Sequence, residues 1–268
     1  MIYLGTLEGV PKRVISLNPS VNEFLALLGV ELAGRDVYSI RPRELLAVPK
    51  VGTFISIDTA ALEKIGPDLA VLYYPVQKNL LDAVSKYSKA VVAIPTPANI
   101  DQIVSIFRYI ARLFNKDEEG DRVAGIYRDL LRGSVIYENV LAVIKFDVYE
   151  VACSNVYVAD VLTAVGLKYR RGLPCFFITR REPPVDLIER ADFVVYESSG
   201  LAYSEREVAF INKSHVVTPG DTIAHYGPSL PLDVQKVAEA AARGERWVGG
   251  VSRLLTPSLR DSWYRPYR

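Results

Sequence analysis

Aromatic and small polar side chains gather in the segments that follow the predicted strands. In the first part of the chain they are Asn18, Ser20, Tyr38, Arg41, Phe54, Tyr73 and Tyr74. In the second part they are Tyr149, Ser154, Asn155, Tyr157, Tyr196, Glu197, Asp221, His225 and Tyr226. Aromatic rings offer apolar area with little loss of conformational entropy, and a few polar groups orient the bound molecule. The set predicts noncovalent binding of a large flat ligand, although with 16 Tyr in the chain any single one is equally expected to be a core or rim residue.

Two members of this set have a more specific chemistry. Arg41 can pair with a carboxylate or phosphate of a ligand, or simply face solvent. A neutral His225 can bind the metal centre of a macrocycle, but the chain has only 2 His and no carboxylate cluster at ligand spacing. We therefore favour a rim histidine that is hydrogen-bonded to its own loop, and we expect no metal-ion site.

The sequence does not predict an enzyme. It contains no GxSxG, GxxxxGK[ST], HExxH or GxGxxG motif, the patterns that mark nucleophile elbows, phosphate loops, zinc proteases and dinucleotide sites. The carboxylates Asp36, Glu44 and Asp147 are scattered along the chain, so we interpret them as solvated charges or caps. No catalytic residue and no required cofactor is expected.

Helix and strand patterns alternate in the first part of the chain. An apolar run at 14–17 stops at Asn18-Pro19-Ser20, where Ser20 is the expected cap of a helix that ends at Gly29. A second helical pattern at 62–65 leads through Gly66-Pro67-Asp68 into an apolar run at 69–72. This alternation favours an α/β fold with a parallel sheet, in which ligands bind beyond the C-terminal ends of the strands.

A long helical pattern separates this region from a second α/β region. Apolar residues recur at helical spacing from Ile103 to Leu131. Strand-like runs follow at 140–146, 175–178, 193–196 and 215–218, with helical patterns at 156–165 and 232–242. We expect a first lobe at 1–98, a connecting helical segment at 99–133, and a second lobe at 134–268. The aromatic and Arg-rich tail of the second lobe is expected to pack over its own lobe rather than to bind a partner.

Three ordered motifs resemble one family of proteins. They are Arg13-Val-Ile-Ser-Leu-Asn-Pro-Ser-Val-Asn-Glu23, Lys50-Val-Gly52 and Ala61-Leu-Glu-Lys-Ile-Gly-Pro-Asp-Leu69. They are similar to the motifs of the class III periplasmic binding proteins, the substrate-binding components of cobalamin, haem and iron-siderophore ABC importers. A weaker resemblance continues through Asn155–Gly166, Asp186–Phe193 and Tyr226–Ser229, so that it extends over most of residues 12–244.

The resemblance implies a fold, a site and a ligand class. The fold would be two Rossmann-like lobes with mainly parallel sheets, joined by a long α-helix, with the ligand in a cleft between the lobes. Tyr38, Phe54 and Tyr73 fall where the family has pocket aromatics. The ligand would be a corrinoid, a haem or a ferric siderophore, although Thr222 and Ile223 stand where cobalamin binders have bulky aromatics.

The resemblance also implies a transporter partner. Family members present one acidic residue from each lobe to an ABC permease, but those places are taken here by Ala60 and Pro184, with Asp58 and Glu182 nearby. The alternative is therefore a cytoplasmic cofactor-binding or protein-interaction module of the same fold, without a transporter. We expect a monomer.

Composition limits the compartment and the partners. With 32 basic and 31 acidic residues, nothing favours nucleic acid as a partner. The start of the chain lacks a basic segment and an apolar signal core, which predicts a cytoplasmic protein as written, or an extracytoplasmic, membrane-associated one if a leader was removed. The single Met and 2 Cys are typical of a thermophile. Cys153 and Cys175 are interpreted as buried free thiols, with a disulfide as the alternative.

Overall fold

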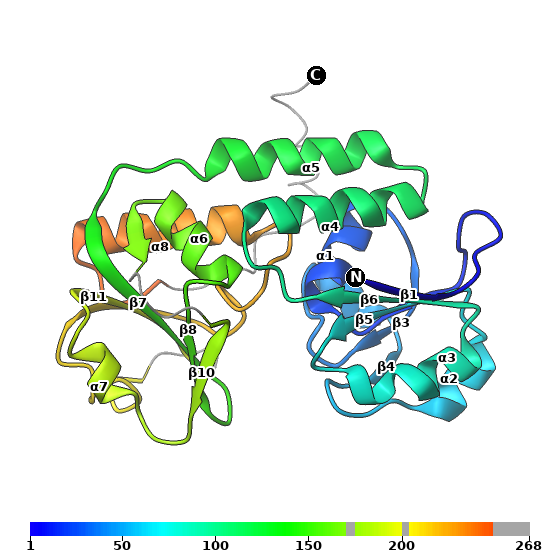
Figure 1. The fold of residues 1–268 in the computed structure, drawn as a ribbon, viewed down its shortest axis with the longest axis horizontal. Helices are drawn as coiled ribbons and strands as arrows, with labels where there is room; N and C mark the ends of the chain where they lie inside the picture. The colour runs from blue at the N-terminus through cyan, green and yellow to red at the C-terminus, as the bar shows by residue number, and fades with distance from the viewer. Residues whose placement is uncertain (170–174, 200–203, 249–268) are drawn as a thin grey trace. The chain divides into compact units, whose positions relative to one another are not determined.

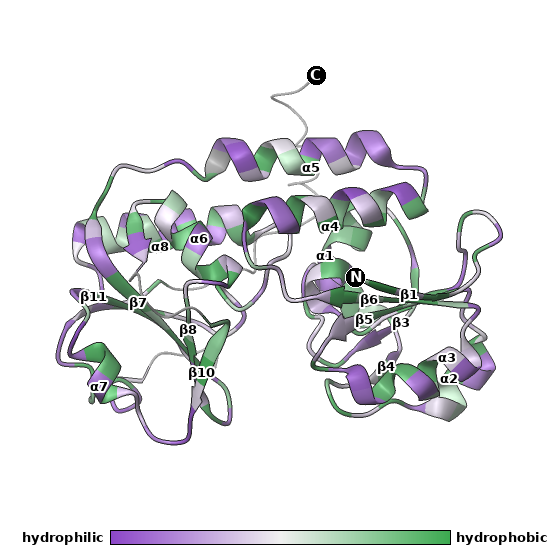
Figure 2. Ribbon diagram, in the orientation of Figure 1, coloured by the Kyte–Doolittle hydropathy of each residue, from purple (hydrophilic) through white to green (hydrophobic). Residues whose placement is uncertain are grey.

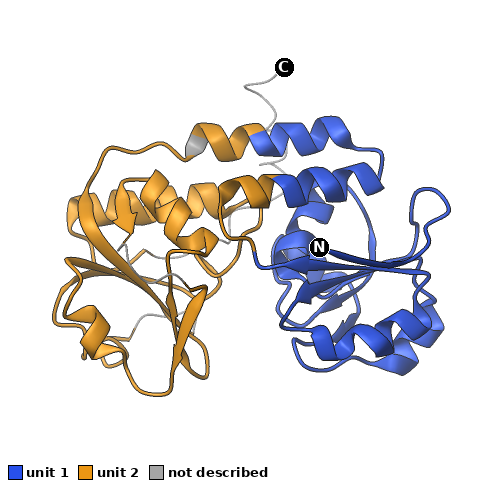
Figure 3. Ribbon diagram, in the orientation of Figure 1, with its two compact units in different colours: residues 1–96, 105–124, 253–268 blue, residues 97–104, 125–252 orange. Residues whose placement is uncertain are grey.

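The computed structural model describes residues 1–169, 175–199 and 204–248 (Figure 1). The described chain divides into two compact units (Figure 3). Of the described residues, unit 1 contains 1–96 and 105–124, and unit 2 contains 97–104 and those between 125 and 248. The predicted packing of the aromatic tail lies outside the described residues.

Unit 1 is built on a sheet of six strands in the order β1-β6-β5-β2-β3-β4. The strands are β1 (Ile2–Gly5), β2 (Val14–Ser16), β3 (Leu32–Asp36), β4 (Lys50–Gly52), β5 (Leu69–Tyr74) and β6 (Ala90–Pro95). Only the pairing of β1 with β6 is antiparallel, and the other pairings of this sheet are parallel. The C-terminal ends of β2 to β6 therefore lie at one edge of the sheet.

Helices cover both faces of this sheet. They are α1 (Pro19–Leu27), α2 (Thr59–Ile65) and α3 (Leu81–Tyr87), with short 3-10 helices η1 (Arg43–Ala47) and η2 (Lys78–Leu80). Leu62 of α2 and Val84 of α3 pack on Ala70 and Leu72 of β5. Because strand side chains alternate, Val71 faces the other side, where Phe24 of α1 stacks on Phe107 with ring centroids 4.5 Å apart.

The first helix begins two residues earlier than the sequence suggests. Its N-cap is Asn18, whose side chain accepts a hydrogen bond from the backbone N–H of Val21, and Pro19 occupies the first turn. The predicted cap, Ser20, lies inside the helix and is buried. The expectation for Ser20 was wrong because proline fits the first helical position, where no backbone N–H is needed, and this moves the cap to the residue before it.

The join between α2 and β5 has the predicted form. Gly66 ends α2 in the left-handed conformation (φ 55°), which glycine adopts without strain. Asp68 then accepts hydrogen bonds from the backbone N–H groups of Lys12 (3.1 Å) and Arg13 (2.9 Å). Asp68 thus fixes the segment before β2 to the segment before β5.

The connecting segment is helical, as predicted, but it consists of two helices. They are α4 (Ile100–Leu113) and α5 (Asp117–Leu130), each of 14 residues. Asn115 takes a left-handed conformation (φ 55°), and the backbone N–H of Lys116 bonds back to Ala111, so the chain turns instead of extending. Arg108 and Asp121 then pair at 2.7 Å, and a Cβ atom on Gly120 would lie 2.8 Å from the side chain of Ala111. These contacts hold the two helices side by side (Figure 1).

Unit 2 is built on a sheet in the order β10-β8-β7-β11-β12, with β9 also paired to β7. The strands are β7 (Tyr137–Lys145), β8 (Tyr149–Ala152), β9 (Leu167–Tyr169), β10 (Phe177–Arg180), β11 (Phe193–Glu197) and β12 (Ser214–Thr218). β7, β9, β11 and β12 are parallel, whereas β8 and β10 are antiparallel additions. The expected α/β class with mainly parallel sheets is confirmed.

The core of unit 2 lies on both faces of its sheet. The helices are α6 (Tyr157–Ala164), α7 (Val185–Ile188) and α8 (Leu230–Arg243). Leu187 and Ile188 of α7 pack against Leu141, Val143 and Val194. Figure 1 shows α6 and α8 on the face opposite α7. In Figure 2 the strands are mainly hydrophobic, and α5 carries many hydrophilic residues. No helix within the described residues has the length and apolarity needed to cross a membrane.

Candidate functional site

Most predicted ligand residues of unit 1 lie at the edge where the parallel strands end. Tyr38 and Arg41 follow β3, Phe54 follows β4, and Tyr73 and Tyr74 end β5. Asn18 follows β2 at the same edge. Ligands of parallel α/β sheets bind beyond this edge, so the topology brings together loops that are distant in the sequence.

An aromatic pair stands at this edge. The rings of Tyr38 and Phe54 stack with centroids 4.7 Å apart and an angle of 15° between their planes. Tyr38 remains 49% exposed, so the pair offers an aromatic surface to solvent. The backbone N–H of Tyr38 donates to Asp36 Oδ1 at 2.6 Å, which fixes the start of its loop.

Asp36 is not the solvated charge that the sequence suggests. It is fully buried, and its Oδ2 accepts hydrogen bonds from Asn22 Nδ2 (3.1 Å) and from the Ser39 hydroxyl. Burial raises the pKa of the Asp36 carboxyl, against the opposing effect of these donors. The interpretation as an exposed charge or cap was wrong because the end of β3 is covered by α1. Asp36 supports the Tyr38 loop from inside.

Aliphatic side chains project from the same group of loops. Ile55 is 86% exposed at the tip of a turn, where the backbone N–H of Thr53 bonds to Ser56 O at 2.8 Å and Thr53 Oγ1 accepts from Ile55 N at 3.1 Å. Ile40 and Val76 are also exposed. We refer to Tyr38, Ile40, Ile55 and Val76 as the apolar loop group. Exposed apolar side chains on several loops at one edge of a sheet favour a binding surface over a core.

The two tyrosines at the end of β5, Tyr73 and Tyr74, have different surroundings. Thr96 Oγ1 donates to the Tyr73 hydroxyl at 2.9 Å, and burial raises the pKa of the Tyr73 phenol. Tyr74 is half-buried and packs against the α2/α3 face of the sheet. The rings of β5 are thus partly core and partly surface.

Gln77 is an organising residue of this edge that the sequence reasoning missed. Its buried side chain accepts from Tyr73 N (2.7 Å) and donates to Leu17 O (3.0 Å) and Thr53 O (3.4 Å). One amide therefore joins the ends of β2, β4 and β5. Nothing local in the sequence marks Gln77, because its partners are far away along the chain.

The polar candidates of unit 1 are buried. Asn18 and Ser20 belong to the first turn of α1 and its cap. Arg41 is only 4% exposed, so the interpretation of a solvent-facing arginine was wrong. An arginine held inside these loops has lost most of its water, and a guanidinium in such a place interacts strongly with an anion that reaches it.

In unit 2, a buried carboxylate organises the loop that follows β12. Glu197, at the end of β11, is 1% exposed. It accepts hydrogen bonds from the backbone N–H groups of Asp221 (2.9 Å), Thr222 (3.1 Å), Ile223 and Ala224 (3.1 Å). Burial raises the pKa of Glu197 to about 7, in spite of these donors. The sequence predicted Glu197 as a polar group at a strand end, but it did not predict the hydrogen bonds between Glu197 and this loop.

Tyrosines hold the rest of this loop. The Tyr127 hydroxyl donates to Tyr226 O (2.7 Å) and Gly227 O (2.6 Å), and the Tyr157 hydroxyl donates to Ile223 O (2.9 Å). Tyr226 is buried, and its ring meets that of Tyr157 edge to face. His225 is buried with Nδ1 3.5 Å from Asp221 Oδ1. The expected rim position of His225 was wrong, because its side chain is buried.

The remaining unit 2 candidates divide into buried and exposed residues. Tyr196 lies inside the core, and its hydroxyl donates to Glu207 Oε1 at 3.1 Å. Ser154 and Asn155 are exposed before α6. Tyr149 is half-buried with the Lys145 ammonium 4.4 Å from its ring centre, and neighbouring Phe146 is exposed. Phe146 was not among the predicted contacts, although it directly follows β7.

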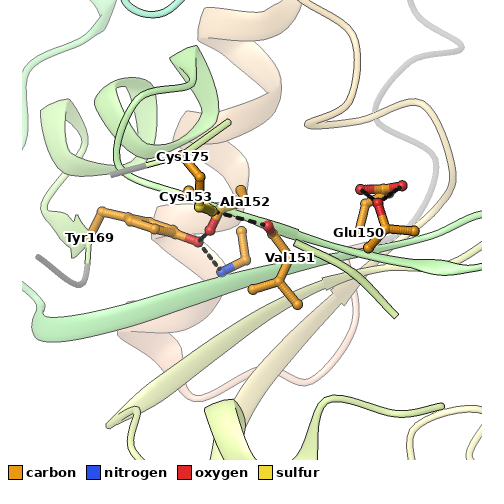
Figure 4. Close-up of a disulfide and its surroundings, with 8 residues drawn as sticks. Glu150, Val151, Ala152, Cys153, Tyr169 and Cys175 are labelled. Carbon is orange, nitrogen blue, oxygen red and sulfur yellow. Dashed lines mark hydrogen bonds between the residues drawn. A yellow bond between two sulfur atoms is a disulfide. The ribbon is translucent and has the colours of Figure 1, made fainter. Parts of the chain in front are cut away.

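Cys153 and Cys175 form a disulfide (Figure 4), so the interpretation as free thiols was wrong. The backbone explains why: Cys153 N bonds to Phe176 O at 2.9 Å, and Asn155 N bonds to Cys175 O at 3.1 Å. These bonds extend the β8–β10 ladder and bring the two Cα atoms to 5.2 Å. The Tyr169 hydroxyl donates to Ala152 O and accepts from Ala142 N beside it. The disulfide thus braces the segment that carries Asn155.

The described residues contain no group of three or more His, Cys, Asp or Glu side chains arranged to hold a metal ion. The candidate site contains aromatic, aliphatic and hydrogen-bonding groups, which can surround and orient a bound chelate.

The chain matches no protein-family model. It is 24% identical over 177 residues to the Fe(3+)-citrate-binding protein YfmC of Bacillus subtilis (strain 168), an alignment that covers 61% of this chain and 56% of that protein. The chain thus matches only a little more than half the length of this curated relative.

Two solved structures are similar over most of the chain. A periplasmic haem-binding protein of Pseudomonas aeruginosa has a TM-score of 0.66 and 18% identity, covering 87% of this chain and 94% of its own. The periplasmic vitamin B12-binding protein BtuF of Vibrio cholerae has a TM-score of 0.68 and 13% identity, covering 88% of this chain and 99% of its own. The resemblance drawn from the motifs is confirmed for the fold: this chain has the fold of the class III periplasmic binding proteins.

Proposed function

We propose that this protein binds a metal chelate, either a corrinoid, a haem or a ferric siderophore, without covalent chemistry. The observation that carries the proposal is the apolar loop group beside the stacked Tyr38–Phe54 pair. All of these side chains stand at the C-terminal edge of a parallel sheet, which is the edge where ligands of this architecture bind. The same surface suits the broad apolar face of a macrocycle or an aryl-bearing siderophore.

The remaining groups of the two units support this role. In unit 1, Gln77 and Asp36 hold the loops from inside, so the binding surface is preorganised and little ordering entropy opposes binding. In unit 2, exposed Asn155 and Phe146 are the proposed contacts. Buried Tyr196, His225 and Tyr226 act in this proposal as supports of the loops.

Proteins with this fold point to the same ligand class. The names of the similar proteins specify ferric citrate, haem and vitamin B12. Two of them are described as periplasmic, which supports an extracytoplasmic location and delivery of the ligand to an ABC permease. Ala60 and Pro184 stand at the places of the expected docking acids, with Asp58 and Glu182 nearby, so these positions do not support docking and a module without a transporter stays the alternative.

The test is a titration of the purified protein with cyanocobalamin, cobinamide, haem, a ferric hydroxamate and ferric citrate. Binding is followed by intrinsic fluorescence and by the melting temperature, because a ligand bound only by the folded state stabilises it by about 2.7 kcal/mol at 100 times Kd. We expect saturable binding of at least one chelate. Tyr38→Ala should weaken it by about tenfold, or about 1.4 kcal/mol.

Tyr3→Ala is the matched control, since Tyr3 is 42% exposed in β1 of the same unit but lies outside the strand-end loops. Its affinity should equal that of the wild type. If no chelate raises the melting temperature, the proposal fails, and the result favours the alternative of a protein-interaction module. If Tyr3→Ala weakens binding as much as Tyr38→Ala, the ligand does not use the apolar loop group.

A further inference from the structure

The loop after β12 surrounds the carboxylate of Glu197, an anionic group of the protein itself. Backbone N–H groups of four successive residues, 221–224, converge on the Glu197 carboxylate. Asp221 takes a left-handed conformation (φ 68°), which allows successive N–H groups to point the same way. Such concave arrangements of amides ordinarily bind phosphate or carboxylate ligands. Here Glu197 occupies the place of the ligand anion.

This loop is also part of the edge at which a ligand is expected in unit 2. It leaves the C-terminal end of β12, which is parallel to β11 and β7. Asp221 and Ala224 are partly exposed, while Thr222 and Ile223 are buried. The conformation of these four residues thus contributes to the surface that unit 2 offers to a ligand, and Glu197 helps to fix that conformation.

Two opposing effects act on Glu197. Complete burial disfavours its charge, whereas four charge-assisted hydrogen bonds favour it. The charged group that acts on it is Asp221, which disfavours its ionisation, and His225 Nδ1 lies 3.5 Å from Asp221 Oδ1. Its register partners on the adjacent strands, Ile144 and Thr218, carry no charge. Burial outweighs the amides and raises the pKa of Glu197 to about 7, so both protonation states of Glu197 are accessible near neutral pH.

We propose that Glu197 is a positioning residue: its ionised carboxylate holds the 221–224 loop in place, and protonation loosens that loop. A neutral carboxylic acid offers weaker acceptor oxygens than a carboxylate and cannot retain all four bonds at full strength. The consequence for binding rests on the proposed function: ligand affinity should decrease on acidification. The loop itself should respond to pH whether or not a ligand binds.

The first experiment needs no ligand. Backbone amide proton shifts of residues 221–224 and the carboxyl carbon shift of Glu197 are followed by NMR from pH 5 to 9. In the wild type, all of these signals should move together with one midpoint. Glu197→Gln should abolish the movement of the amides. Glu150→Gln is the control, because Glu150 is a partly buried glutamate of the same sheet, bonded to Thr179 in β10, and it should leave the amide titration unchanged.

The results separate this proposal from its alternatives. Amide shifts that are constant across this range in the wild type would overturn it, and this outcome does not depend on whether the variant folds. An amide titration that persists in Glu197→Gln would also overturn it, by assigning the effect to His225 or Asp221.

The second experiment uses haem as the probe and measures its Kd over the same range. Affinity should fall by up to about tenfold per pH unit below the midpoint, with no such fall in Glu197→Gln. If neither haem nor the other chelates bind at any pH, the proposed function fails. The amide titration then still tests whether Glu197 positions the 221–224 loop.

Discussion

Tyr38 and Phe54 stack face to face, with ring centroids 4.7 Å apart, although they belong to loops that leave different strands. The pair exists because β3 and β4 are parallel neighbours whose ends meet at one edge. The candidate binding surface is therefore a product of sheet topology.

The first prediction concerns the strength of this pair. Stacked rings contribute about 0.5–1.5 kcal/mol beyond their buried area, so Tyr38→Ala and Phe54→Ala should show a coupling energy of about 1 kcal/mol in a double-mutant cycle. The measurement is the free energy of unfolding in urea. The control cycle combines Tyr38→Ala with Tyr3→Ala, which should be additive. Additivity in both cycles would mean that the stack contributes nothing to stability.

The second prediction concerns Gln77. Gln77→Leu keeps the apolar part of the side chain but leaves Tyr73 N, Leu17 O and Thr53 O without this partner. Buried polar groups that lose a partner cost about 1–3 kcal/mol each when water cannot replace it, so we expect a loss of ~2 kcal/mol or more. Faster hydrogen exchange at the Tyr73 amide should accompany it. The exposed neighbour Lys78→Ala serves as control and should change stability by less than about 0.5 kcal/mol.

The features that were predicted from sequence are those whose cause is local. Gly66 ends α2 within its own motif, and β5 begins at Leu69 directly after that motif. The alternation of strands and helices follows from the apolar patterns. Ser20 shows that even a local prediction can be displaced by two residues, because the presence of Pro19 moved the cap to Asn18.

The features that were missed depend on contacts across the sheet. Gln77 reaches Leu17, and Glu197 reaches the 221–224 loop. Their residue types occur anywhere on a protein surface, so only the fold reveals their burial. Arg41 and Asp36 were misplaced for the same reason: a charged residue is expected in water unless its partners are known. The disulfide likewise needed the β8–β10 pairing, which no spacing in the sequence indicates.

The third prediction concerns Asp68. The backbone N–H of Arg13, together with the cations of Arg13 and Lys89, holds the pKa of Asp68 well below its ordinary value of 3.8. A lowered folded-state pKa contributes stability that is present above the unfolded value and is lost as the pH falls below it. Asp68→Asn should therefore destabilise the protein by about 2 kcal/mol at pH 7, and by less at pH 3.

Thermal unfolding at the two pH values checks this prediction. Asp186→Asn is the control, because Asp186 forms an exposed pair with Arg180 at 3.5 Å and such pairs contribute about 0–1 kcal/mol. Equal destabilisation by Asp68→Asn at both pH values would show that its effect does not come from the charge.

The fourth prediction concerns the disulfide. Its cysteines are 22 positions apart, and closing a loop of that size restricts the unfolded chain by about 3 kcal/mol. Unfolding in urea with a thiol reductant should therefore show a lower midpoint than without it. In the Cys153→Ala/Cys175→Ala variant the two midpoints should coincide at the lower value. A wild type insensitive to reductant after full unfolding and refolding would contradict the bond.

The fifth prediction gives the pH dependence of stability that Glu197 imposes. Its pKa is raised from 4.5 to about 7, so between these values the folded protein retains a proton that the unfolded chain has lost. The folded state binds more protons, and the stability contributed by Glu197 therefore decreases as the pH rises from 4.5 to 7. The difference corresponds to about 3 kcal/mol as an upper limit.

This dependence is opposite in sign to that of Asp68, and the two are separated by pH range. Asp68 acts below about pH 4, whereas Glu197 acts between pH 4.5 and about 7. Urea unfolding of the wild type should thus give lower stability at pH 8 than at pH 5.5, and Glu197→Gln should flatten that slope because glutamine does not titrate. A slope that survives in Glu197→Gln would assign it to another group. The ionised carboxylate of Glu197 binds the four amides most strongly, but burial disfavours this ionised form. The loop is therefore held most tightly at the pH where Glu197 contributes least to the free energy of unfolding.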